Sequence, residues 1–254
     1  MSFDVAPTLA AVFMLIFARV GTLVMLLPGV GERAIPARFR LSAALLMTLV
    51  LYPLVSRFYP ETISGAPQLI GLLGGEVLVG GVLGITGRLL LSSLQTAGTV
   101  IAMQMGLGFV MQVDPTMQQQ GALVGNFLTL VGLTFLFATD VHHLSIMALG
   151  DSYEIFRPGV LPDLGDSARY AVTVAAGAFR IGVQIAAPIL IFGIIFNVGL
   201  GLLSRLMPQM QVFFIAVPAA ILLGFALMAV TLPAMMTTFS DHVVQGMSEL
   251  LMRR

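Results

Sequence analysis

The sequence predicts an all-α, polytopic membrane-type protein, and three observations lead to this prediction. Hydrophobic residues make up 58% of the 254 residues and charged residues only 9%, well below the roughly 25% charged residues of soluble domains. The mean hydropathy is +1.01. Apolar runs of helical length recur along the chain, and no alternating pattern indicates strands. With zero formal net charge, this composition excludes an ordinary soluble enzyme, a disordered chain and a nucleic-acid binder.

Apolar runs in the first half of the chain predict its helices in order. The first run covers residues 9–27, and the second covers 41–55, which is short for a bilayer that needs about 20 residues. A glycine-dense run at 69–91 is followed directly by an uncharged run to residue 113. Asp114-Pro115 ends that run, because the residue before a proline avoids helical angles.

The second half contributes a further span at 121–138 and two strong spans at 181–204 and 212–230. Between them, residues 140–169 carry five acids and two arginines and are predicted to form a polar connection. The sequence thus predicts about six long apolar helices. Prolines inside or after the last two spans predict kinked helices packed against protein: Pro188, Pro218 and Pro233. A tight turn is predicted between these two spans, formed by Arg205, Pro208 and Gln209.

A stripe of residues four positions apart lies along one face of a predicted helix. It consists of Glu76, Gly80, Gly84 and Arg88. Two glycines between opposite charges allow another backbone to approach closely. The same small-residue spacing recurs at Gly121 and Gly125. Both helix packing within the chain and a subunit interface in a membrane complex are consistent with this pattern.

The segment from residue 103 to 121 is too polar for lipid, although it lies between two apolar spans. Non-helical backbone at membrane depth is tolerated only inside protein or along a cavity. Because methionine adapts to irregular gaps, one interpretation is a deformable constriction that excludes small ions. The other interpretation is an ordinary surface loop. The residues of the candidate constriction are Met103, Met105, Phe109, Met111, Asp114 and Pro115.

Ionisable residues in or beside apolar spans are a second candidate for function. They are Arg19, Glu76, Arg88, Asp114, Asp140 and Arg180. They are consistent with a proton path or with ion pairs between subunits. Asp140, His142 and His143 hint at metal chemistry, but no further spaced ligand follows, so no metal site is predicted. Catalytic and cofactor motifs are also missing, and we predict neither an enzyme nor a cofactor.

Several motifs together resemble one known family. They are Arg19-Val20, Gly31-Glu32-Arg33, Leu78-Val79-Gly80, Gln104-Met105-Gly106-Leu107, Val113-Asp114-Pro115 and the series from Asn197 to Arg205 with Pro208-Gln209. The likeness runs from about residue 10 to 240, and the chain resembles the FliR family of flagellar export proteins, called SctT in injectisomes. The general likeness favours the flagellar branch.

The resemblance implies a fold, a function and partners. Members are subunits of the type III secretion export gate in the bacterial inner membrane and flagellar basal body. They assemble with FliP and FliQ subunits, with FlhB and FlhA alongside, and pass unfolded proteins. The fold implied is a FliP-like part at residues 1–166 followed by a FliQ-like helical hairpin at 167–254. Partner subunits and membrane lipid would share the apolar surface.

The resemblance also implies a plug loop at 106–115, in which Phe109 closes the pore. Some members have a second aromatic residue where this chain has Gln112, and Met111 is then expected to fill that space. Members often carry an acid where this chain has Thr99. The alternative hypothesis is a secondary transporter or small-ion channel that uses Glu76, Arg88, Asp114 or Asp140.

Overall fold

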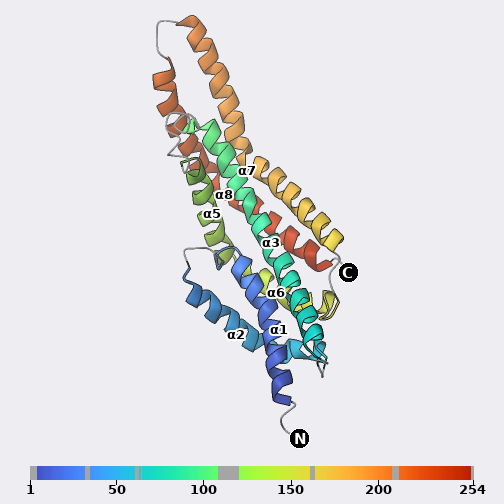
Figure 1. The fold of residues 1–254 in the computed structure, drawn as a ribbon. Coiled ribbons are helices and arrows are strands. Elements are labelled where there is room, and N and C mark those ends of the chain that lie inside the picture. Colours follow the sequence, from blue (N-terminus) through green and yellow to red (C-terminus); the bar gives the residue numbers. More distant parts are fainter. Residues whose placement is uncertain are drawn as a thin grey trace. The chain divides into compact units, whose positions relative to one another are not determined.

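A computed structural model describes residues 5–31, 35–60, 63, 65–107, 120–160, 164–207 and 212–252 of the chain. These residues form seven α-helices and one short 3-10 helix, and none of them lies in a strand (Figure 1). The all-α prediction is therefore confirmed. The helices are α1 (Val5–Leu26), α2 (Ala37–Val55), η1 (Ser56–Phe58), α3 (Ala66–Gln104), α5 (Gln120–Ala138), α6 (His142–Ile155), α7 (Leu164–Leu206) and α8 (Val212–Met252).

Five of these helices are long and apolar enough to cross a membrane, and a bent pair formed by α5 and α6 makes up to six. The sequence predicts about six, so the polytopic character is confirmed. α3 has 39 residues, which gives about 58 Å at 1.5 Å per residue. That length is well beyond the roughly 30 Å of a bilayer core, so hydropathy alone does not fix which part of α3 faces lipid.

Packing divides the chain into two compact units. Unit 1 consists of Met1–Leu90, Asp140–Ala175 and Val243–Arg254, and unit 2 consists of Leu91–Thr139 and Ala176–His242. The long helices α3, α7 and α8 each contribute one part to each unit. This division by contacts is a different description from the FliP-like and FliQ-like parts, whose boundary at residue 166 stays a prediction.

Unit 1 is built around α1, whose buried side chains recur on one face. Leu15, Ile16, Val20 and Leu23 are almost fully buried. α1 lies against α2 and the first half of α3, where Phe13 of α1 approaches Tyr52 of α2 with 6.3 Å between ring centroids. Aliphatic side chains of α1 thus form much of the core of unit 1.

The polar connection predicted at 140–169 is wrong in one respect, because it contains the helix α6. Ala148, Leu149, Ser152 and Tyr153 of α6 are buried, whereas Asp151 and Glu154 are exposed. The buried positions recur at a spacing of four, so they share one face of a helix. The acids that made the segment look like a loop lie on the opposite face.

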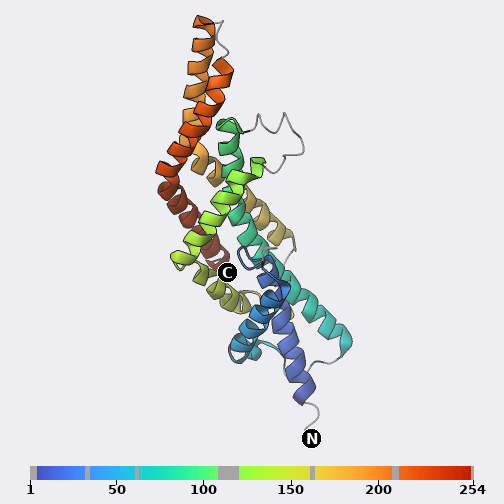
Figure 2. The ribbon, with the colours of Figure 1, turned by 90° about the vertical axis from the view of Figure 1, so that its left-hand side faces the viewer.

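Unit 2 contains the C-terminal part of α3 from Leu91 onward, α5, and the adjoining parts of α7 and α8. The parts of α7 and α8 in this unit run side by side as a hairpin (Figures 1 and 2). Pro188, Pro218 and Pro233 all lie inside these two helices. The two apolar runs predicted at 69–91 and up to 113 are one continuous helix that ends at Gln104, followed by Gly106 with a φ of +78°.

Candidate functional site

A buried ion pair joins two helices of unit 1. The Arg19 side chain of α1 donates to both carboxylate oxygens of Glu76 on α3, from Nε at 2.6 Å and from a terminal nitrogen at 3.2 Å. Each side chain is 1% exposed. The planar guanidinium suits this two-point contact with a carboxylate. For such residues the sequence is consistent with a proton path or with ion pairs between subunits, but this pair forms within one chain.

Two further groups of unit 1 complete the hydrogen bonding of Arg19. Its terminal nitrogens donate to the hydroxyl of Ser152 at 3.0 Å and to the carbonyl oxygen of Phe156 at 2.9 Å. The guanidinium also lies 3.9 Å from the ring centroid of Tyr153, which is a cation–π distance. One arginine therefore ties α1 to α3 and to the end of α6.

Tyr59 follows η1 and extends this cluster. Its ring lies 6.4 Å from that of Tyr153 in an edge-to-face arrangement. Burial and the neighbouring Glu76 carboxylate raise the pKa of the Tyr59 hydroxyl above its usual range, so the hydroxyl stays protonated. Neither tyrosine nor Ser152 is a candidate site residue in the sequence, because no local motif marks them.

The glycine stripe on α3 faces α1 of the same chain. A Cβ atom at Gly80 would overlap the carbonyl oxygen of Arg19, and one at Gly84 would lie 2.5 Å from the Cβ of Leu26. Both distances are too short for a real side chain, so these glycines permit the close approach of α1 to α3. Arg88, at the end of the stripe, is exposed.

A second close helix crossing lies in unit 2. A Cβ atom at Gly98 of α3 would overlap the backbone of Gly125 on α5. Gln95 lies beside this crossing and donates to Thr129 at 2.9 Å and to Asn126 at 3.3 Å. Gly125 therefore lies at a helix contact, as its spacing suggests, and Gly121 lies in the first turn of the same helix.

The end of α3 is fastened to two other helices of unit 2. Gln104 occupies the space beside Gly193 of α7, and Met105 lies beside Gly224 of α8, where an added Cβ would be 2.5 Å from the methionine Cγ. Met105 is fully buried, whereas Met103 is exposed. The other predicted constriction residues, Phe109, Met111, Asp114 and Pro115, lie outside the described residues.

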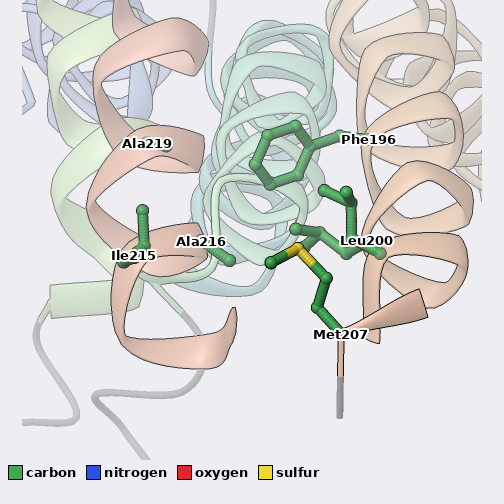
Figure 3. Close-up of a pocket in the computed structure, with 7 residues that line it drawn as sticks. Phe196, Leu200, Met207, Ile215, Ala216 and Ala219 are labelled. Atoms are coloured by element: carbon green, nitrogen blue, oxygen red, sulfur yellow. The ribbon is translucent and has the colours of Figure 1, made fainter. Parts of the chain in front are cut away.

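An apolar pocket lies between α7 and α8 near the end of their hairpin (Figure 3). Its volume is about 190 Å³. Phe196 and Leu200 of α7 point toward Ile215 and Ala216 of α8, and Met207 covers one side. Of the predicted turn, Arg205 is exposed at the end of α7, and Pro208 and Gln209 lie outside the described residues.

Large apolar side chains cover the outside of this hairpin. On α7 these include Ile191, Ile194, Ile195, Val198 and Leu202, and on α8 they include Ile215, Leu222 and Val230. A contiguous apolar surface on this scale marks contact with another protein or with lipid. The hairpin therefore offers an apolar surface for contact with another protein or with lipid.

Comparison with known proteins identifies the family of this chain. Residues 10–246 match the model of the family described as bacterial export proteins, family 1. The chain belongs to this family. This export protein is 44% identical over 232 residues to the flagellar biosynthetic protein FliR of Caulobacter vibrioides, which covers 90% of this chain and 91% of that protein. The resemblance to the FliR family seen in the sequence motifs is thereby confirmed.

Two more distant relatives carry the same name. The export protein is 29% identical to the flagellar biosynthetic protein FliR of Escherichia coli, over 92% of this chain and 88% of the relative. It is 27% identical to that of Bacillus subtilis, over 86% of this chain and 85% of the relative. The similarity extends over nearly the whole length of each protein, so it includes both packing units.

Proposed function

We propose that the chain is a structural subunit of the flagellar type III protein export gate. Its membership of the bacterial export family over residues 10–246 carries this proposal, and relatives named flagellar biosynthetic protein FliR support the flagellar assignment. In the proposed role the chain forms part of a conduit for unfolded proteins across the bacterial inner membrane. It performs no catalysis of its own and needs no cofactor.

The exposed apolar surface of the α7–α8 hairpin supports an assembled state. Side chains such as Ile195 and Val230 are more than half exposed in the single chain. Burying apolar surface stabilises by about 25 cal/mol per Å², so partner subunits gain by covering these helices. We propose FliP-like and FliQ-like subunits as these partners, with FlhB-like and FlhA-like proteins adjacent and lipid on the remaining surface.

The packing of the described helices on either side of residues 106–115 supports a role for this segment as a plug. Met105, just before it, is fully buried beside Gly224. After it, α5 is held against α3 at Gly98 and Gly125. The helices that precede and follow the segment, α3 and α5, thus pack against each other within unit 2. In this role the plug closes the conduit to ions, while Phe109, Met111, Asp114 and Pro115 yield to a passing polypeptide.

Of the predicted packing stripe on α3, one residue remains exposed for a subunit contact, Arg88. Gly80 and Gly84 are covered by α1, whereas Arg88 is exposed on α3. We propose that Arg88 pairs with an acid of a neighbouring subunit. Because Arg19 pairs with Glu76 within the chain, Glu76 is not a free carboxylate of the kind that a secondary transporter would use.

Co-purification tests the proposed assembly. The chain, with an affinity tag, is expressed with and without the FliP-like and FliQ-like proteins of the same organism. We expect one stable complex in detergent with them and a degraded or aggregated chain without them. A homogeneous, stable monomer that does not bind the other two subunits would contradict the proposal.

Replacing residues 107–114 by a glycine-serine segment of the same length tests the plug. The substitution keeps the connection between α3 and α5 but removes the apolar side chains. We expect the complex to assemble normally and the membrane to leak small ions, measured as conductance in planar bilayers. Native conductance in an assembled variant would show that this segment does not close the pore.

A further inference from the structure

The turn before α6 has an unusual backbone. After α5 ends, the amide of Thr139 still donates to the carbonyl oxygen of Phe135 at 2.9 Å. Asp140 then adopts a φ of +59°, in the left-handed region that most residues other than glycine, asparagine and aspartate seldom enter. The amide of His143 donates to the Asp140 carbonyl oxygen at 3.0 Å. The left-handed residue thus folds the chain back onto the first turn of α6.

This fold-back gathers three metal-binding side chains. Nδ1 of His143 lies 3.7 Å from a carboxylate oxygen of Asp140, and the rings of His142 and His143 lie 4.2 Å apart. One donor atom from each of the three residues lies within 4.8 Å of the other two. The spacing in the sequence shows only two neighbouring histidines and an acid, and the left-handed residue is what brings the carboxylate to them.

From this cluster we infer a site for a divalent transition metal of the Zn²⁺ class, held by Asp140, His142 and His143. Two imidazole nitrogens and one carboxylate oxygen are ligands that Zn²⁺ and its neighbours prefer, whereas Ca²⁺ and Mg²⁺ take oxygen ligands. Three protein ligands leave a fourth tetrahedral position for water or for a donor of a neighbouring subunit. This inference is independent of the proposed export function.

Binding a metal ion at this site requires only a small rotation of the three side chains. Ligands at about 2.0–2.2 Å from a zinc ion lie closer to one another than the donors do here, so the side chains must turn inward. Asp140 and His143 are exposed, with 77% and 60% of their side-chain surfaces accessible, and are free to rotate. His142 is half-buried and provides the fixed member of the set.

The Asp140 carboxylate is not engaged in holding the helix. In the part of the chain that the structure describes, its contact is the one with His143, and it accepts no hydrogen bond from a backbone amide. Acids before a helix usually accept such bonds. The Asp140 carboxylate therefore makes no helix-capping bond that metal binding would have to break.

Cobalt binding tests this site, because Co²⁺ replaces Zn²⁺ and has visible absorption bands. The full chain, in the complex in which it is stable, is purified through a tag without histidine and titrated with CoCl₂. We expect one Co²⁺ per chain, displaced by Zn²⁺. The affinity is expected to fall at least about tenfold in His142→Ala, His143→Ala and Asp140→Asn, since each removes one of three ligands.

Two variants separate metal binding from folding. Asp140→Gly removes the ligand but accepts a positive φ without strain, so it is expected to assemble normally and lose Co²⁺ binding. The third histidine of the chain, His242, lies on α8. The His242→Ala variant is expected to bind Co²⁺ as the native chain does. Absence of stoichiometric Co²⁺ binding, or binding that survives both histidine substitutions in the turn, would overturn the site.

Discussion

Arg19 shows at the scale of single residues how this chain holds a charge inside an apolar helix bundle. An unpaired charge in such surroundings is very costly, and Arg19 avoids the cost through two bonds to Glu76, one to Ser152 and one to the Phe156 carbonyl. Few groups other than guanidinium could serve four acceptor atoms at once. The Arg19–Glu76 pair therefore connects α1 to α3, and the further bonds of Arg19 connect α1 to α6 and the residue after it.

Removing one partner of this pair is expected to destabilise unit 1. Arg19→Met leaves the Glu76 carboxylate buried without its cation, at a cost of about 3–5 kcal/mol. Thermal unfolding of the purified complex, followed by circular dichroism, measures the loss. In the double variant with Glu76→Leu no charge remains buried, and most of the stability is expected to return. An Arg19→Met variant as stable as the native protein would contradict this role.

At the scale of elements, α3 contains glycines that have two different effects on stability. Gly98 lies at the crossing with α5, where a Cβ atom would overlap Gly125. Gly74 lies in the same helix and has no atom within 4 Å of an added Cβ. The first glycine permits a close backbone contact, and the second only weakens the helix, since glycine is less favourable than alanine in a helix interior.

The same substitution at the two positions is expected to act in opposite directions. Gly98→Ala forces α3 and α5 apart, at a cost of about 1–3 kcal/mol. Gly74→Ala removes a flexible residue and stabilises the helix by up to about 1 kcal/mol. Unfolding temperatures of the two variants under identical detergent conditions make the comparison. Equal effects would show that the α3–α5 crossing does not depend on Gly98.

At the scale of the whole molecule, the main feature is apolar surface that one chain cannot cover. α7 places Ile189 in the core with no exposure and Ile195 on the outside with 67% exposure. Both are isoleucines of one helix, in the same packing unit. They therefore allow the contribution of the outer surface to be separated from that of the core.

Asparagine at these two positions is expected to cause different defects. Ile189→Asn buries an amide in the core and costs about 2–5 kcal/mol, so the chain should fail to accumulate. Ile195→Asn should leave the fold within about 0.5 kcal/mol of native but weaken recovery of the partner subunits in a pull-down. If Ile195→Asn retains its partners in full, that part of α7 faces lipid or solvent.

The local properties of the sequence were sufficient to predict the fold class. Composition and helical periodicity act over a few turns, and they indicated an all-α membrane-type protein with glycines suited to close packing. The helix α6 was missed, because its exposed acids Asp151 and Glu154 made residues 140–169 look like a polar loop. Its buried positions are recognisable only as one face of a helix.

The amino-acid sequence shows which residues are unusual, whereas their contacts follow from how the helices pack. Arg19 and Glu76 stood out as charges in apolar runs, but they are 57 positions apart, and no local pattern indicates that they pair. Ser152 and Tyr153 join them only because the fold places α6 within reach of the Arg19 side chain. The left-handed conformation of Asp140 likewise brings its carboxylate to His143. Such contacts depend on the packing of whole helices and on single backbone angles, which a one-dimensional pattern does not encode.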